Sequence, residues 1–217
     1  VNFYLRDRWV QQQVEAVRLA GPEYGDVGVG QGRRMMVEFV SVNPTGPVHV
    51  GHTRGAVLGS ALANILAAAG YEVTREYYVN DAGNQMEAFY RSLYARYKQA
   101  LDLPAELPDN GYVGDYVIDL GREIAEAEGS RYAQMEESQA VREIGDVGRE
   151  KMVNLIREDL AQIGVAFDQW FSERTLYREG RYDEAMQILR DKNYLSERDD
   201  ALWFNSTMLG DDKDNVV

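Results

Sequence analysis

The feature that most constrains the fold is a strand–helix–strand pattern between residues 35 and 79. The apolar run Met35–Val40, interrupted by Glu38, predicts a buried strand that ends in the turn-forming segment Asn43–Pro47. The helix that follows ends at Gly70, and small residues cover much of its surface, so it can pack closely on a sheet. The helix is predicted from apolar residues that repeat at helical spacing, which are Val57, Leu58, Ala61, Leu62, Ile65, Leu66 and Ala69. Tyr71–Val79 predicts a second strand, which completes a parallel, right-handed unit of an α/β fold.

Both histidines of the chain lie where the first strand passes into this helix, in the sequence Pro47-Val48-His49-Val50-Gly51-His52. Helix N-terminal amides and the helix dipole attract anions, and imidazoles can donate hydrogen bonds to phosphate oxygens. Gly51 leaves room for a flat ring to approach the backbone. The same spacing also occurs where histidines merely cap a helix or form a turn. The position between a strand and an apolar helix favours a site for a nucleoside triphosphate.

The charge balance and the lack of cysteine restrict the classes of function. The chain has 23 Lys and Arg against 36 Asp and Glu, a net charge of −13, which disfavours nonspecific nucleic-acid binding and limits any RNA contact to a local patch. Without cysteine there is no disulfide or thiolate metal site, which fits a reducing compartment. No apolar run approaches the roughly 18 residues that span a bilayer, and the N-terminus has no signal-peptide layout. We therefore expect a cytoplasmic protein with no membrane partner and no protein-bound metal.

The residues before the first strand have weaker patterns. Val1–Leu5 alternates like a strand, and Arg6–Ala20 has the pattern of a helix. The Gly-rich segment Gly25–Gly32 does not meet the requirements of a phosphate loop, because no strand leads into it and no Lys-Ser/Thr pair ends it. We expect a surface linker there. The chain has no initiator Met, so we expect it to be a piece of a longer protein.

From Asp81 onward the pattern changes to successive helices. We expect helices over 82–100, 113–128 and 138–164, with a proline-containing loop over 103–110. The aromatic stripe of the first of these helices predicts a core rather than a base-stacking platform. The charged residues of the third predict a solvated face. They are Arg142, Glu143, Arg149, Glu150, Lys151, Arg157, Glu158 and Asp159.

Shorter elements are expected in the last fifty residues. A strand is predicted over 167–171 and a helix over 181–190. Residues 194–197 and 202–205 predict a hairpin around Asp199-Asp200. Val216-Val217 has the pattern of a strand that is cut short.

Three segments together resemble arginyl-tRNA synthetase, a family of class I aminoacyl-tRNA synthetases. They are Val37-Glu38-Phe39-Val40-Ser41-Val42-Asn43-Pro44, His49-Val50-Gly51-His52-Thr53-Arg54 and Asn80-Asp81-Ala82-Gly83-Asn84-Gln85. The His-x-Gly-His element is shared by all class I synthetases and by small nucleotidylyltransferases, so it selects only the superfamily. The Glu-x-x-Ser-x-Asn run and the Asp-x-Gly-x-Gln run are what point to arginine. The resemblance covers essentially the whole chain and is strongest over 35–85.

The resemblance implies an α/β fold in which a Rossmann-like parallel sheet, the first half of a class I synthetase catalytic domain, is followed by a largely helical insertion. It divides the chain into an N-terminal strand, helix and linker (1–34), a nucleotide-binding half (35–80) and a helical insertion with a terminal hairpin (81–217). A tRNA-binding domain would precede Val1. The second catalytic half, a Lys-Met-Ser-Lys loop and an anticodon-binding domain would follow Val217, so we expect the chain alone to be inactive.

The activity that the resemblance implies is that of an arginine–tRNA ligase. The arginine carboxylate attacks the α-phosphate of ATP, which carries Mg²⁺, and arginine then passes to the 3′ end of tRNA(Arg). No protein nucleophile is needed, because positioning and charge stabilisation supply most of the catalysis. The oligomeric state is left open, with a monomer favoured.

The resemblance also implies roles for residues at the carboxyl end of the first strand and the start of the helix. His49 and His52 are expected to be the catalytic groups on the ATP phosphates and ribose, and Gly51 is expected to admit the adenine. Ser41 and Asn43 are expected to hold the amino acid's α-amino and carboxylate groups, with Asn43 also in reach of ATP.

Glu38 is expected to bind the guanidinium of arginine. A lone carboxylate in a buried strand is costly unless it is paired, and a guanidinium is a bidentate partner. The alternative is a structural ion pair with an internal cation such as Arg75. Asp81, Gly83 and Gln85 are expected to form a wall of the site, with a structural turn as the alternative.

Three rival functions remain open at this point. A small nucleotidylyltransferase would share the His-x-Gly-His but would need neither Glu38 nor a long helical insertion. Another class I synthetase would keep the fold and change the amino acid. A noncatalytic module derived from a synthetase would show no dependence on ATP.

Overall fold

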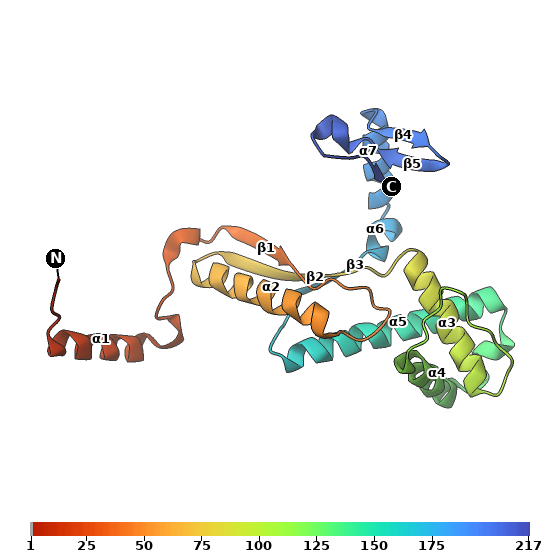
Figure 1. Ribbon diagram of the computed structural model, residues 1–217, viewed down its shortest axis with the longest axis horizontal. Helices are drawn as coiled ribbons and strands as arrows, with labels where there is room; N and C mark the ends of the chain where they lie inside the picture. The colour runs from red at the N-terminus through yellow and green to blue at the C-terminus, as the bar shows by residue number, and fades with distance from the viewer. Residues whose placement is uncertain (1) are drawn as a thin grey trace. The chain divides into compact units, whose positions relative to one another are not determined.

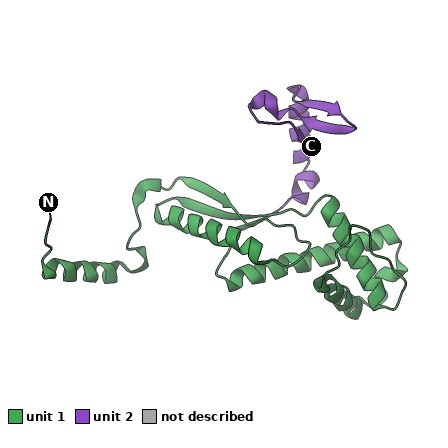
Figure 2. Cartoon of the chain, viewed as in Figure 1, with its two compact units in different colours: residues 1–171 green, residues 172–217 purple. Residues whose placement is uncertain are grey.

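The computed structural model describes residues 2–217 and divides the chain into two compact units, residues 1–171 and residues 172–217 (Figure 2). The boundaries that the sequence predicts after residues 34 and 80 both fall within the first unit and stay predictions. No helix among residues 2–217 has both the length and the apolar character needed to cross a membrane.

A three-stranded sheet organises the first unit (Figure 1). Strand β1 (Arg34–Glu38) pairs in parallel with β2 (Glu72–Val79), and β3 (Gln169–Ser172) lies on the other side of β2. Helix α2 (Val50–Ala68) connects β1 to β2. The predicted α/β fold with its strand–helix–strand unit is therefore confirmed, with boundaries shifted by one to two residues.

Strand β1 is not the buried strand that the sequence predicts. It lies at the edge of the sheet with β2 as its neighbour, and Met35, Met36 and Glu38 are all exposed. The Glu38 carboxylate is therefore not buried in this chain, and the expected energetic cost of burying it does not arise. Apolar strands are buried only when a layer covers them, and the sequence of a strand does not show whether a layer is present.

Helix α2 packs on the sheet through its smallest residues. Ala56, Gly59 and Ala63 are fully or almost fully buried, which confirms the close packing that the small residues predict. The larger apolar residues of the helix point away from the sheet and are exposed. They are Val57, Leu58, Leu62 and Ile65.

The helical part of the first unit agrees with the predicted pattern. Helices α3 (Asn84–Ala100), α4 (Asp115–Glu128) and α5 (Glu137–Gln162) occur where the sequence predicts them, and residues 103–110 form a connection without helix or strand. Their shared core includes the aromatic stripe of α3, as predicted. Its buried members include Phe89, Leu93, Tyr97, Leu120, Ile124 and Ile144.

Helix α5 links this helical core to the core of the sheet. It has 26 residues, a length of about 39 Å, and its first half packs in the helical core. Its second half contributes Ile156 and Leu160 to a second core with Phe39 and Tyr77. One rigid element therefore contacts both the sheet and the helical bundle.

The N-terminal residues contain one expected helix, α1 (Asp7–Ala20), which buries no residue. The predicted strand over 1–5 is wrong for residues 2–5, which form neither helix nor strand, while Val1 lies outside the described residues. The Gly-rich segment 25–32 lies at the surface, as predicted, except at Gly30. Gly30 is buried and donates its N–H to the Ala69 carbonyl at 2.7 Å, so this segment is bound to the end of α2. The short 3₁₀ turns η1 (Gly21–Glu23) and η2 (Gly28–Gly30) lie here.

The second unit contains the predicted helix α7 (Arg181–Asp191) and the predicted hairpin, formed by β4 (Leu195–Arg198) and β5 (Ala201–Phe204). Asp199 and Asp200 make the turn with φ values of 52° and 56°. The expected short last strand is β6 (Asn215–Val216), which pairs with β5. Sequence patterns did not predict the five-residue helix α6 (Arg174–Arg178) or the 3₁₀ turn η4 (Ser206–Leu209) of this unit. A further 3₁₀ turn, η3 (Tyr132–Gln134), lies in the first unit between α4 and α5.

Candidate active site

The two histidines cap the N-terminus of α2. His49 is the N-cap residue, and its Nδ1 accepts a hydrogen bond from the Gly51 N–H at 3.1 Å. The His52 Nδ1 in turn accepts from the His49 N–H at 3.4 Å, which closes a capping box. The two imidazole rings stack with their centroids 3.6 Å apart. The alternative role of these residues as helix caps is therefore real, and it coexists with any role in binding.

This cap determines which ring nitrogens can serve a ligand. Because Nδ1 of each neutral imidazole accepts a backbone hydrogen bond, its proton lies on Nε2. Each histidine then offers one N–H donor at the positive end of the α2 dipole. A side chain on Gly51 would collide with the His49 ring, since a Cβ there would lie 2.9 Å from Cε1. The missing side chain of Gly51 thus lets the ring fold back over the helix end, a purpose that the sequence did not predict.

Burial lowers the pKa of His52 below its ordinary value, and the adjacent His49 imidazole lowers it further. Two protonated rings in a stack would repel each other, so the pair favours at most one positive charge. The lowered pKa of His52 favours its uncharged form, which suits hydrogen bonding to phosphate.

A sharp bend carries the chain from β1 to the histidines. Val40 and Ser41 both have positive φ values, 68° and 45°, which side chains rarely adopt. The Ser41 hydroxyl accepts a hydrogen bond from the Tyr78 N–H at 3.1 Å and donates to the Phe39 carbonyl. Tyr77 of β2 holds the next residue, because its hydroxyl accepts from the Val42 N–H and donates to the Val42 carbonyl. The bend is thus fastened to β2 at two positions.

Asn43 and Gln85 come together although they are 42 residues apart. The Asn43 side-chain amide donates to Oε1 of Gln85 at 2.5 Å, and Gln85 lies in the first turn of α3. Gly83 is the N-cap of α3 with φ of 81°, and its carbonyl accepts the Met86 N–H. The two motifs that frame the histidines, one before and one after β2, therefore meet at this contact.

Asp81 lies in the interior and not on an open wall. Its side chain is fully buried, and Oδ2 forms an ion pair with Nη1 of Arg149 at 2.9 Å. The expectation that Arg149 belongs to a solvated face of α5 is wrong, because its side chain is only a quarter exposed. This pair fastens the end of β2 to α5.

Helix α4 also contacts the bend. The Tyr116 hydroxyl donates to the Thr45 carbonyl at 2.7 Å, and a Cβ on Gly46 would lie 3.1 Å from the Tyr116 ring. Burial raises the pKa of Tyr116 to about 12, so its hydroxyl stays protonated at neutral pH. Sequence reasoning missed Tyr116, Tyr77 and Arg149. Their sequence positions, on a helix, a strand and a charged helix face, gave no signal that could identify the distant partners.

Glu38 ends β1 with its side chain exposed. The internal cation proposed as its structural partner, Arg75, pairs instead with Asp168 and Asn64. Among residues 2–217, no Lys, Arg or His forms an ion pair with Glu38. The Glu38 carboxylate is therefore available to bind a ligand. It lies at the carboxyl end of β1, where the bend toward the histidines begins.

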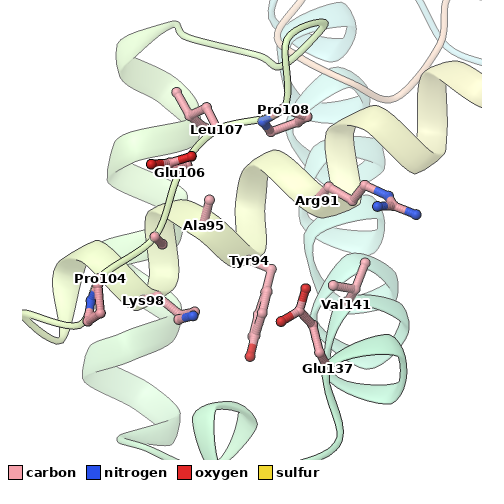
Figure 3. A pocket seen from close by; sticks show the side chains of 11 residues that line it. Arg91, Tyr94, Ala95, Lys98, Pro104, Glu106, Leu107, Pro108, Glu137 and Val141 are labelled. Atoms are coloured by element: carbon pink, nitrogen blue, oxygen red, sulfur yellow. The ribbon is translucent and has the colours of Figure 1, made fainter.

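The cavity of about 470 Å³ shown in Figure 3 lies elsewhere, between α3, the 104–108 connection and the start of α5. None of the predicted site residues lines it. Among residues 2–217, no group of three or more His, Asp or Glu side chains could hold a metal ion.

Comparison with known proteins gives consistent results over the whole chain. The family described as tRNA synthetases class I (R), catalytic domain, matches residues 13–213. Arginine–tRNA ligases of Dehalococcoides mccartyi and Geobacillus kaustophilus are 50% and 47% identical to this chain over 217 residues. These alignments cover 100% of this chain and 39% of each relative, so the chain spans well under half of their length.

Solved structures show the same similarity. A Campylobacter jejuni structure named as an arginyl tRNA synthetase superimposes with a TM-score of 0.82 and 31% identity, covering 98% of this chain and 46% of that one. The Thermus thermophilus arginyl-tRNA synthetase superimposes with a TM-score of 0.57 and 21% identity, covering 99% of this chain and 36% of that one. The second similarity concerns the fold alone.

Proposed function

Because the chain belongs to the family of class I (R) tRNA synthetase catalytic domains, we propose that it supplies the ATP-binding part of an arginine–tRNA ligase. The whole protein then joins arginine to AMP, releases pyrophosphate, and transfers arginine to tRNA(Arg). Magnesium enters bound to the phosphates of ATP, as part of the substrate. We place this activity in the cytoplasm, since a chain without cysteine fits a reducing compartment.

The stacked histidine pair at the start of α2 is the observation that most supports this function. The cap leaves the Nε2–H donors of His49 and His52 for the phosphates of ATP, where the helix dipole adds to their effect. In adenylate formation, negative charge shifts onto the leaving pyrophosphate. Fixed donors at that position lower the barrier without having to reorganise.

The amino acid is proposed to bind at the carboxyl end of β1. The exposed Glu38 carboxylate has no cation partner among the described residues and can accept both N–H groups of one edge of a guanidinium. Asn43, held by Gln85, and Ser41 lie on the bend between Glu38 and the histidines. Ser41 already bonds to the backbone of Tyr78, so we assign it to shaping the bend, and Asn43 to the α-amino and carboxylate groups.

The test separates the capping role of the histidines from the binding role. In His52→Asn the amide can replace Nδ1 as the cap acceptor but cannot replace Nε2, whereas in His52→Gln an amide nitrogen can reach the Nε2 position. We expect His52→Asn to lower arginine-dependent exchange of pyrophosphate into ATP about 100-fold or more in the whole protein, and His52→Gln to retain more activity. Both variants should unfold at the wild-type temperature.

Unchanged exchange in His52→Asn would remove His52 from the site. Exchange that depends on an amino acid other than arginine would favour another class I synthetase. A small nucleotidylyltransferase is disfavoured, because the family match extends through the helical residues to position 213.

A further inference from the structure

The bend between β1 and α2 depends on residues of the helical part for its conformation. Residues 39–49 contain no helix or strand, and Val40 and Ser41 have left-handed backbone conformations. A segment of this kind needs outside contacts to stay in one conformation. Tyr77 fastens its first part at Val42, and His49 belongs to the helix cap. The contacts at Thr45 and Gly46, midway between these points, come from Tyr116.

Tyr116 contacts the bend in two ways. Its hydroxyl donates to the Thr45 carbonyl at 2.7 Å, and its ring lies against Gly46. Tyr116 lies in the first turn of α4, 71 residues away in the chain, and α4 packs on α3 in the helical core. The contact therefore joins the helical part to the middle of the ligand-binding bend.

We propose that Tyr116 is a positioning residue, whose O–H holds the bend so that Asn43 and the histidine pair face their ligands together. This proposal rests on the proposed function, because the ligands are arginine and ATP. Tyr116 does not contact the reacting atoms. It acts through the Thr45 carbonyl by raising the fraction of molecules whose bend is ready to bind.

This role predicts a particular kinetic pattern in the whole protein. If Tyr116→Phe leaves only a fraction of the free molecules with a competent bend, the apparent affinity for ligands falls by that fraction. Saturating ligands restore the competent bend. We expect the KM for arginine in pyrophosphate exchange to rise about three- to tenfold, while kcat stays within about twofold of the wild type.

A purely structural role gives the opposite pattern. If Tyr116 only stabilises the fold, Tyr116→Phe leaves fewer folded molecules, so apparent kcat falls and KM does not change. Tyr116→Leu, which also removes the ring from Gly46, should raise KM further than Tyr116→Phe. An unchanged KM in Tyr116→Phe overturns the proposal.

Tyr112→Phe is the matched control, because Tyr112 precedes the same helix and its hydroxyl makes no hydrogen bond within residues 2–217. It should leave KM and kcat at wild-type values. If Tyr112→Phe raises KM as much as Tyr116→Phe, the effect does not come from the bond to Thr45 and the proposal fails.

A second measurement separates this proposal from the proposed function. His49 and His52 are the only histidines, so their ring signals in NMR spectra report on the end of the bend without overlap. In the 217-residue chain, Tyr116→Phe should shift or broaden the His49 ring signals, while Tyr112→Phe should not. Wild-type protein without arginine-dependent exchange would defeat the proposed function alone, whereas unchanged His49 signals in Tyr116→Phe would defeat the positioning role.

Discussion

At the residue scale, the histidine pair shows how one motif can serve the fold and the ligand together. Nδ1 of each ring belongs to the helix cap, which leaves Nε2 for chemistry. The sequence presented capping and phosphate binding as alternatives. The geometry makes them complementary, because the cap fixes the tautomer and orientation of the donors.

The depressed pKa of His52 gives a pH prediction. Burial and the His49 ring both disfavour the protonated form of His52 in the folded chain. At pH values between its folded and its unfolded pKa, folding therefore releases a proton from His52. The stabilising contribution of the neutral ring is fully present above the unfolded value of about 6.5, and it is lost as pH falls through the lower folded pKa. We expect an NMR titration of the native chain to show His52 titrating below 6.5.

Two comparisons test the causes of this shift. In the urea-unfolded chain, His52 should titrate near its ordinary value, because both causes of the shift are lost. In His49→Gln, the pKa of His52 should recover only part of the shift, because burial is the larger cause. A native His52 that titrates at or above 6.5 would show that its partial burial and its stacking on His49 do not persist in solution.

Glu38 gives the sharpest separation of binding from stability. Because its side chain is exposed and unpaired within residues 2–217, Glu38→Gln should change the free energy of unfolding by less than about 0.5 kcal/mol. The same change should raise the KM for arginine in the whole protein at least about tenfold, equivalent to about 1.4 kcal/mol, and leave the KM for ATP nearly unchanged.

Asp168→Asn provides the comparison for Glu38→Gln, because Asp168 is a carboxylate that does pair with Arg75. It should lower stability without a specific effect on arginine. If Glu38→Gln leaves both Michaelis constants unchanged, arginine is selected by residues outside this chain.

At the element scale, α2 was predicted well in extent but not in orientation. Its period, its glycine end and its close packing all follow from the sequence. The sequence pattern could not show that the larger residues face outward, because a helix that is apolar on most of its surface has no single preferred face. Strand β1 shows a related limit, because Met35 and Met36 were predicted to be buried and are exposed, whereas Val37 packs against the core of the sheet.

Contacts between distant elements were the other part that the sequence could not supply. The motifs predicted which residues gather at the carboxyl end of β1, since parallel strands bring their ends to one edge. The sequence placed Asn43 and Gln85 at one site but did not indicate the hydrogen bond between them, and nothing in it indicated that Arg149 reaches Asp81. Such pairs depend on how helices pack, and a charged residue at a helix surface position looks the same whether its partner is water or a buried carboxylate.

The packing of α2 on the sheet can be tested at Gly59. A Cβ there would lie 2.1 Å from Cγ of Phe39, so Gly59→Ala requires the ring or the helix to move. We expect the free energy of unfolding in urea to fall by about 1–3 kcal/mol. Gly55→Ala is the control, since nothing lies within 4 Å of its Cβ position and alanine should stabilise the helix by about 0.5–1 kcal/mol. Equal stabilisation by both changes would contradict the close contact with Phe39.

At the scale of the whole molecule, α5 carries the coupling between the two cores of the first unit. Its first half packs with α3 and α4, and its second half packs beneath the sheet. Arg149, near the middle of the helix, pairs with Asp81 at the end of β2. The helical part is therefore joined to the candidate site through the pair with Asp81, the contact of Gln85 with Asn43, and Tyr116.

This arrangement predicts which activities the 217-residue chain retains by itself. The groups that hold the histidine pair and the bend all lie within the chain, so we expect MgATP to shift the ring signals of His49 and His52 in NMR spectra. His52→Asn should weaken that response.

We expect no arginyl-tRNA from the chain alone, because it spans 39% of the length of its relatives and its net charge of −13 opposes RNA binding. Charging assays with purified chain, arginine, ATP and tRNA would check this. Arginine-dependent charging above the level of His52→Asn would show that the bend, the helix cap and the helical part are sufficient for both steps of the reaction.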